Sequence, residues 1–202
     1  MQAARVFVDF DGTISRQDTT DLLLEQFADP EWLDIESSWL RGEIGSRECM
    51  ARQISLLRVT PAALAECLRD VEIDPAFSRF VKLCHDRGLS VTVLSDGLDI
   101  VVETVLRHAG IALPVLANCA TATEADRWQL SFPHMRSNCA SAAGNCKCAV
   151  LATRAPRAVL RADSIRVGDG RSDFCGATAA GAVFAKGKLI VHCRATRLRH
   201  IP

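Results

Sequence analysis

Three short apolar segments, each ending in polar and glycine residues, organise this chain. Residues 5–10 read RVFVDF before Gly12-Thr13, residues 89–94 read LSVTVL before a Ser-Asp-Gly turn, and residues 164–167 read SIRV before Gly-Asp-Gly. Such runs are typical of buried parallel strands. Helical patterns follow at residues 98–109 and 173–180, and further short strands are expected at 115–117 and 182–185. We therefore predict an α/β fold, a Rossmann-like, mainly parallel sheet flanked by helices.

A long stretch between the first and second strands contains no convincing strand. Its segments LLLEQFA, EWLDIESSWL and ECMARQISLL carry apolar residues at spacings of three and four, which predicts helices. We expect residues 15–75 to form a small helical cap, inserted into a core made of residues 1–14 and 76–202. Phe27, Trp32 and Trp39 are expected to form the cap's own small core rather than to contact a substrate.

Polar side chains stand where the predicted strands end. Ligands bind at the carboxyl ends of strands in open α/β sheets, so these side chains should share one crevice. Buried carboxylates are costly unless a cation or hydrogen-bond donors meet them. Oxygen donors without sulfur suit Mg²⁺. The sequence therefore predicts a magnesium site that draws on Asp9, Asp11, Asp169 and Asp173.

The same region carries groups suited to phosphate. Gly12 allows close backbone approach, and the amides of residues 11–13 can point toward phosphate oxygens. Ser95 adds a hydroxyl donor, and Lys147 adds a compact positive charge. Phosphoryl transfer needs mainly positioning and charge neutralisation. One carboxylate can attack phosphorus while another acts as acid and base.

These motifs resemble those of the haloacid dehalogenase-like phosphatases. Residues 9–13 (DFDGT) match the family's D-x-D-G-T, Ser95 its second motif, Lys147 its third and residues 168–173 (GDGRSD) its fourth. The resemblance covers nearly the whole chain, and the helical insert is similar to the family's first-type cap. It implies that Asp9 is the nucleophile and Asp11 the general acid/base.

The resemblance also implies the ligand sets. Asp169 would bind Mg²⁺ directly, Asp173 directly or through water, and the Asp11 carbonyl would be a further ligand. Phosphate would be bound by Gly12, Thr13, Ser95, Asp96, Gly97 and Lys147.

Within the family, the chain resembles the branch that contains phosphoserine phosphatase and a phosphatase of methionine salvage. Residues 131–147 (SFPHMRSNCASAAGNCK) and the ending RHIP are similar to the latter. Phosphoserine phosphatases use an early acidic residue for the substrate amine, which Asp18 matches, and a cap arginine for the carboxylate. That cap position carries Gln53, although Arg52 and Arg47 lie nearby. Because glutamine cannot replace an arginine fork, the phosphoserine assignment is weakened. His134 is a further candidate substrate contact.

Composition narrows the partners. The chain has 24 basic and 24 acidic residues, so no net field attracts nucleic acid or an anionic membrane surface. No segment approaches the roughly 18 apolar residues of a membrane span. We expect a cytoplasmic enzyme, monomer or homodimer, acting on a small phosphorylated metabolite without nucleic acid or membrane partners.

The nine cysteines are expected to be reduced thiols. Cys139, Cys146 and Cys148 lack the paired C-x2-C spacing of a zinc site, so packing is the favoured interpretation. Redox sensitivity that displaces Lys147 stays open as a hypothesis.

Three alternatives share the fold. A dehalogenase needs neither a metal nor an acid at position 11, so Asp11 favours phosphate chemistry. A phosphomutase would retain all four motifs and differ in how the cap excludes water. A non-catalytic binding protein would have no need of both Asp9 and Asp11.

Overall fold

The protein is built around one six-stranded sheet with the order β4-β3-β2-β1-β5-β6. A computed structural model describes residues 4–139, 141–153 and 164–202. Five of the strands are parallel, and β4 runs antiparallel to β3. The predicted mainly parallel α/β fold is therefore confirmed. The strands are β1 (Arg5–Val8), β2 (Ser90–Leu98), β3 (Val115–Ala122), β4 (Trp128–Ser131), β5 (Ser164–Gly168) and β6 (Ala182–Ala185).

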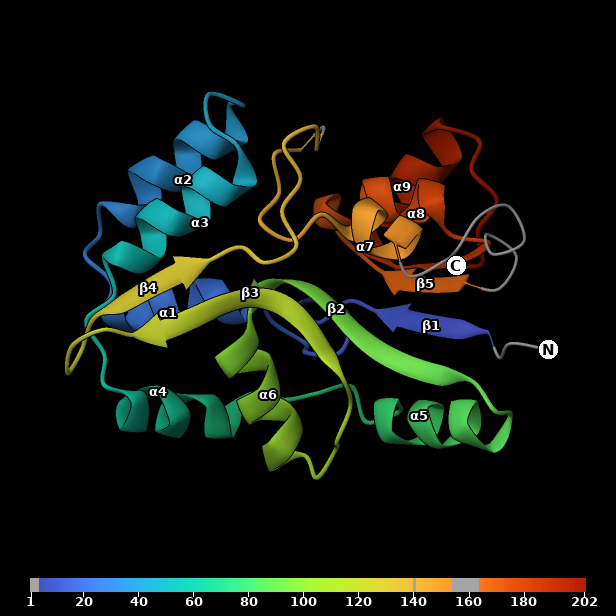
Figure 1. Cartoon of the computed structure of the whole chain (residues 1–202), viewed down its shortest axis with the longest axis horizontal. Coiled ribbons are helices and arrows are strands. Elements are labelled where there is room, and N and C mark those ends of the chain that lie inside the picture. The colour runs from blue at the N-terminus through green and yellow to red at the C-terminus, as the bar shows by residue number, and fades with distance from the viewer. Residues whose placement is uncertain (1–3, 140, 154–163) are drawn as a thin grey trace.

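Helices cover both faces of the sheet. Figure 1 shows α4, α5 and α6 along one face and α7, α8 and α9 along the other, with α2 and α3 beyond β4. The α-helices among the described residues are α1 (Thr19–Phe27), α2 (Trp32–Leu40), α3 (Ser46–Ser55), α4 (Pro61–Cys67), α5 (Phe77–Asp86), α6 (Asp99–His108), α7 (Lys147–Thr153), α8 (Phe174–Ala179) and α9 (Gly187–Ala195). Two 3₁₀ turns, η1 (Leu68–Asp70) and η2 (Arg171–Asp173), complete the set.

Strand β1 lies at the centre of the sheet and is buried on both faces. Val6 pairs with Val91 of β2 and with Ile165 of β5. Val6 and Val8 belong to the main hydrophobic cluster, whereas Phe7 packs on the opposite face in the cluster that contains residues of α7. Side chains alternate between faces along a strand, so Asp9 continues the face of Phe7. This alternation directs Asp9 toward α7.

The insert between β1 and β2 is helical, as expected. It contains α1 to α4, and its apolar residues join the same hydrophobic cluster as the sheet. Trp32 is buried in that cluster and Phe27 packs against it, so these two residues share the core of the sheet and do not form a separate core of the cap as expected. Trp39 is absent from the three hydrophobic clusters of the described residues, so its expected place in a cap core is wrong. The last turn of α2 extends beyond the cluster, and the Trp39 ring instead lies 5.5 Å from the Arg171 guanidinium carbon.

The largest differences from the expected strands concern β2, β3 and β4. Strand β2 does not end at residue 94 but continues to Leu98, with a register irregularity between Leu94 and Leu98. Ser95 therefore lies in an irregular part of the strand rather than after it. Strand β4 was not expected, and it pairs with a β3 that reaches Ala122.

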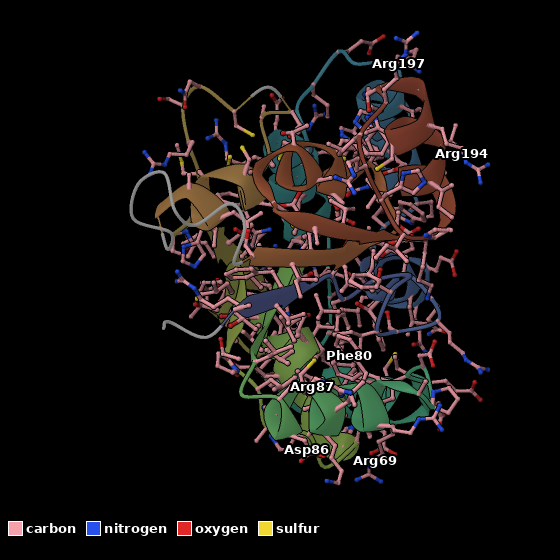
Figure 2. All side chains as sticks on the ribbon, turned by 90° about the vertical axis from the view of Figure 1, so that its right-hand side faces the viewer. Arg69, Phe80, Asp86, Arg87, Arg194 and Arg197 are labelled. Atoms are coloured by element: carbon pink, nitrogen blue, oxygen red, sulfur yellow. The ribbon has the colours of Figure 1, made fainter. Side chains whose placement is uncertain are left out.

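Charged side chains mark the outer surfaces of the helical layers. Figure 2 shows Arg194 and Arg197 pointing outward near α9, and Arg69 and Asp86 pointing outward on the opposite side of the sheet. None of the described helices has the length and apolar character needed to cross a membrane.

Candidate active site

The carboxyl ends of β1 and β5 meet the start of α7 at one edge of the sheet. Asp9 directly follows β1, and its amide donates to the Val167 carbonyl at 2.9 Å. Lys147 is the first residue of α7, and the loop after β5 carries two further acids. Ligands bind at this edge in open parallel sheets. Strand register thus brings together four predicted site residues: Asp9, Lys147, Asp169 and Asp173.

Four charged side chains form what we call the buried ionic cluster: Asp9, Lys147, Arg166 and Asp173. The Lys147 Nζ lies 2.7 Å from Asp9 Oδ1 and 2.8 Å from Asp173 Oδ1. It also donates to the Ser172 hydroxyl at 2.9 Å. Arg166 binds Asp173 through Nε and Nη2, and its Nη2 lies 3.8 Å from Asp9 Oδ1. Mutual pairing makes the burial of these charges tolerable.

The two aspartates of the buried ionic cluster differ in how readily they ionise. Burial alone would raise the pKa of Asp173, but the adjacent Arg166 and Lys147 outweigh it and hold that pKa below its usual range. The pKa of Asp9 is raised by burial and then by the nearby Asp173 charge, against the opposing pull of Lys147 and Arg166. The Asp173 side chain therefore favours the anion more strongly than the Asp9 side chain does, and added positive charge would help to keep Asp9 ionised.

The oxygen atoms around Asp9 fit a divalent cation. One carboxylate oxygen from each of Asp9, Asp169 and Asp173 lies within 4.8 Å of the others. Both oxygens of Asp173 already have donors, because Oδ2 accepts from the amides of Asp169 and Gly170 at 3.1 and 3.3 Å. The Asp169 carboxylate accepts a 3.1 Å hydrogen bond from the Thr13 hydroxyl. An all-oxygen donor set with a destabilised carboxylate is suited to Mg²⁺.

The loop after β1 requires glycine. Gly12 has a φ of +70°, in the left-handed region that favours glycine. A Cβ at this position would lie 2.5 Å from Asp169 Oδ2. The first-motif loop and Asp169 can therefore approach one another only because residue 12 has no side chain.

Asp11 lies beside this loop and can hold a proton near neutral pH. Its Oδ1 accepts from the Thr19 amide at 2.8 Å and from the Thr19 hydroxyl at 2.7 Å. Burial, followed by the Asp18 charge, raises the pKa of Asp11 to about 7, while the Thr19 hydrogen bonds oppose that rise. A carboxyl group with this pKa is suited to proton transfer at neutral pH. A Cβ at Gly97 would lie 3.0 Å from Asp11 Oδ2, so the backbone of the second motif lies directly against that oxygen.

The second motif is fixed by an amide network. The Ser95 hydroxyl is buried and accepts from the Gly97 amide at 2.9 Å. The Asp96 carboxylate accepts from the Asn145 amide at 2.8 Å and from the Ser46 hydroxyl at 2.9 Å. Asn145 also donates through Nδ2 to the carbonyls of Ser95 and Leu116, each at 2.7 Å. Asp96 thus joins the strand end to the start of α3 and to the segment before α7.

A cavity of about 380 Å³ lies next to these motifs, and we call it the cap cavity. One wall comes from α2, α3 and the loop between them, and the opposite wall from η2. Its size suits a small metabolite. The Ser172 hydroxyl, which accepts from Lys147, links this wall to the buried ionic cluster. The cap cavity is lined by Trp39, Gly42, Glu43, Ile44, Gly45, Ser46, Asp96, Ser141, Ala142, Arg171 and Ser172.

The candidate substrate residues of the insert lie outside the lining of the cap cavity. The Arg52 side chain is half exposed and pairs with Glu48 at 3.7 Å. Gln53 is buried and donates to Glu36 at 3.0 Å. Asp18 caps α1 by accepting from the amides of Thr20 and Asp21, and Arg47 donates to the Met135 sulfur at 3.2 Å.

His134 is also distant from the cap cavity lining. It contributes to a separate cavity of about 410 Å³, together with Met135, Arg136, Ala149 and Val150. The structure therefore does not bring His134 together with Trp39 and Arg171, which face the cap cavity.

Two thiols flank Lys147. The sulfurs of Cys146 and Cys148 lie 3.5 Å apart. Burial raises the pKa of Cys148 to about 12 and also raises the pKa of Cys146. A thiol is a nucleophile only as thiolate, so these shifts disfavour oxidation of Cys146 and Cys148 at neutral pH. The pKa of Cys139 is instead lowered, because hydrogen bonds from Ser141 and from the Ala143 amide outweigh its burial. The redox hypothesis stays a prediction.

Sequence reasoning missed three residues that build the site. Arg166 stands in a segment that reads as an apolar strand, and its charge was the only local signal. Asn145 and Ser46 act through hydrogen bonds to Asp96 and show no sequence pattern. Their roles depend on contacts between distant segments.

Comparison with known proteins defines the class. The sequence profile of the haloacid dehalogenase-like hydrolases matches residues 6–178. The chain belongs to the haloacid dehalogenase-like hydrolase family.

Individual relatives refine that assignment. The chain is 30% identical to the 2-hydroxy-3-keto-5-methylthiopentenyl-1-phosphate phosphatase of an Exiguobacterium species, over 99% of this chain and 92% of that protein. It is 28% identical to the protein of the same name from Bacillus velezensis, over 98% of this chain and 84% of that protein. Among solved structures, a phosphoserine phosphatase with an analogue of its phospho-aspartyl intermediate superposes with a TM-score of 0.73 at 18% identity, over 100% of this chain and 93% of that chain. At this identity the likeness shows the fold alone.

Proposed function

We propose that this protein is a Mg²⁺-dependent phosphomonoester hydrolase that acts on a small phosphorylated metabolite through an aspartyl-phosphate on Asp9. One observation carries the proposal. The Lys147 ammonium lies 2.7 Å from Asp9 Oδ1, with an Asp169 oxygen within 4.8 Å of an Asp9 oxygen. Asp9 therefore has a cation beside it that can bind a phosphate group, and a second carboxylate, Asp169, that can bind a metal ion with it.

The proposed reaction has two steps. An oxygen of Asp9 attacks phosphorus, the ester P–O bond breaks, and Asp11 gives its proton to the leaving oxygen. The Asp11 carboxylate then takes a proton from a water molecule that attacks the phosphorus, and the bond to Asp9 breaks to release inorganic phosphate. The pKa of about 7 at Asp11 suits both transfers. Lys147, Ser95, Asp96, Gly97 and the backbone of Gly12 and Thr13 would bind the phosphate group.

Asp9, Asp169 and the Asp11 carbonyl are proposed to hold Mg²⁺. Asp173 is fully engaged by Lys147, Arg166 and two amides, which favours a contact through water for this residue. When bound, the ion reduces repulsion between a carboxylate nucleophile and a phosphate dianion.

The substrate is proposed to be most similar to that of the methionine-salvage phosphatases, whose names the full-length relatives carry. The cap cavity supports this choice, because Trp39, Ile44 and Ala142 offer apolar surface to a thioether tail. Phosphoserine is the alternative. It is disfavoured because the position of the family's cap arginine carries Gln53, which donates to Glu36, and because Arg52 lies outside the cavity lining, which leaves Arg171 as the arginine of that lining. Cytoplasmic location, the absence of nucleic acid and membrane partners, and a monomeric or dimeric state remain predictions.

Phosphate release from a substrate panel tests the proposal. The panel includes the methionine-salvage intermediate, phosphoserine, pyridoxal phosphate, phosphoethanolamine and an aryl phosphate, each with Mg²⁺ and with chelator. We expect chelator-sensitive turnover, restored by Mg²⁺, that is highest for the methionine-salvage intermediate. Preference for phosphoserine would overturn the substrate assignment. Retained phosphate binding without turnover of any compound would favour a non-catalytic binding protein.

A further inference from the structure

Arg166 is a fully buried arginine in the middle of β5. Its exposed fraction is 0%, and it heads the largest fully buried side chains of the described residues. Arg166 pairs with Phe7 of β1 and so lies on the sheet face that Asp9 continues. A permanently charged guanidinium is costly to bury, and an apolar residue would satisfy the sheet at lower cost. Packing alone therefore does not explain why an arginine occupies this position.

Arg166 shares its acidic partner Asp173 with Lys147, within a cluster of two cations and two acids. Its Nε and Nη2 bind Asp173 Oδ1, the same oxygen that receives Lys147 at 2.8 Å. Two cations thus share one carboxylate. Nη2 also donates to the Leu94 carbonyl at 3.3 Å, and Nη1 has no hydrogen-bond partner among the described residues. The nearest other acid is Asp9, whose Oδ1 lies 3.8 Å from Nη2.

The same contacts leave neither carboxylate oxygen of Asp173 available to bind the metal ion directly. Its Oδ1 is bound by Lys147 and Arg166, and its Oδ2 by the amides of Asp169 and Gly170. An approaching Mg²⁺ would therefore meet the repulsion of two fixed cations, and its proposed ligands would be the carboxylates of Asp9 and Asp169 and the Asp11 carbonyl. An approaching phosphate dianion would meet the attraction of the same two cations.

We propose that Arg166 is a positioning residue that acts as a second, permanent cation beneath Asp9. It holds Asp173 in place and strengthens phosphate binding while it weakens Mg²⁺ binding. This inference rests on the proposed function, because it assigns both ligands to the same site. A purely structural arginine would not move the two affinities in opposite directions.

The test removes the charge of Arg166 and measures the affinities for Mg²⁺ and for phosphate at equilibrium. Arg166→Met removes the guanidinium with little loss of volume. By titration calorimetry, we expect the affinity of the metal-free protein for Mg²⁺ to rise about tenfold. We expect the affinity of the Mg²⁺-saturated protein for inorganic phosphate to fall about tenfold, since both changes follow from the loss of one near charge. Arg166→Lys keeps the charge, so both affinities should stay within about threefold of the wild type.

Arg194→Met is the matched control. It removes the same charge from α9, where Figure 2 shows the side chain pointing outward from the protein. Solvent and salt screen such a distant charge, so neither affinity should change. Parallel changes in the two affinities of Arg166→Met, or no change in either, would overturn the inference.

Folding is checked by circular dichroism and thermal unfolding. Asp173 keeps Lys147 as a partner in the variant, so we expect Arg166→Met to fold. If it does not, Arg166→Gln gives the same readout with a polar neutral side chain. Failure of both neutral variants to fold would contradict the inference and make Arg166 part of the scaffold.

The outcomes separate the inference from the proposed function. A wild-type protein that binds neither Mg²⁺ nor phosphate overturns both. A wild-type protein that binds both ligands, with Arg166→Met unchanged in each affinity, overturns only the role of Arg166.

Discussion

The buried ionic cluster and the cap cavity lie next to one another but are built differently. In the buried ionic cluster, the Lys147 and Asp173 side chains are 0% exposed and the Asp9 side chain is 6% exposed. The cap cavity is instead formed by the end of one helix, the start of another and loops, and its Arg171 is exposed. Strand register fixes the first region, whereas contacts between the insert and the core shape the second.

This difference suggests a division of labour. A paired, buried cluster has one arrangement and suits chemistry common to many substrates. A cavity bordered by loops can change its lining without disturbing the sheet. A hydrogen bond from Lys147 to Ser172 joins the regions. Substitutions in the two regions should therefore affect different kinetic constants.

The largest effect is expected from Lys147→Met. This change removes a cation from Asp9, so kcat should fall by about 10²- to 10³-fold, as for the loss of other preorganised charge-stabilising groups. It also leaves Asp9 and Asp173 in repulsion, and the free energy of unfolding should fall by about 3 kcal/mol. Steady-state kinetics and denaturant unfolding check both. Lys82→Met, which affects an exposed pair with Asp86, serves as control and should change neither.

The next effect concerns pH. Asp11 must be protonated to act as an acid, so kcat/KM should decline as pH rises through about 7. Asp18→Asn removes a negative charge that raises the pKa of Asp11, so the decline should move to lower pH. Thr19→Val removes a hydroxyl that stabilises the Asp11 anion, so the decline should move to higher pH. Shifts of about 0.5 to 1 pH unit are expected for such single interactions.

The pH profiles are measured with an alkyl phosphate, whose leaving group needs the proton. An aryl phosphate, with a better leaving group, should show a shallower decline. Shifts of the two variants in the same direction would contradict the assignment of Asp11 as the acid.

A smaller effect is expected in the cap cavity. Trp39→Ala and Arg171→Met should each raise KM for the preferred metabolite by about 3- to 30-fold, because each removes one wall contact. The kcat for a small aryl phosphate should stay near that of the wild type. A large fall in kcat for both substrates would show that the cap cavity takes part in chemistry and would remove the division of labour.

The smallest effect is expected from Arg52→Ala. Arg52 is half exposed and pairs with Glu48, and such surface pairs contribute about 0 to 1 kcal/mol. Kinetic constants for every compound of the substrate panel should be unchanged. A rise in KM confined to phosphoserine would instead identify Arg52 as a carboxylate contact and revive that substrate.

The parallel strands of the sheet could be predicted from the sequence, because most of them are short apolar runs that end in polar motifs. Strand β4 was missed because WQLS is short and of mixed polarity, and its pairing with β3 is decided by tertiary contacts. Trp39 was misplaced because helical spacing reveals a face but not where a neighbouring layer ends.

The acids of the site were predictable for the same reason, since strand ends converge in an open sheet. Arg166 was not, because the sequence gives no sign that a charge inside β5 meets Asp173 of the following loop. The assigned roles of Asp9, Asp11 and Lys147 stay predictions that the geometry supports.

Trapping the phosphoenzyme tests the central claim most directly. Protein mixed with substrate and Mg²⁺ is quenched in acid within one turnover, reduced with borohydride and digested, and peptides are sequenced by mass spectrometry. An acyl phosphate on Asp9 is reduced to homoserine, so the account predicts homoserine at position 9 alone. Asp9→Asn, treated in parallel, should give none. Homoserine at Asp11 or Asp169, or none in a wild-type protein that turns over substrate, would contradict the account.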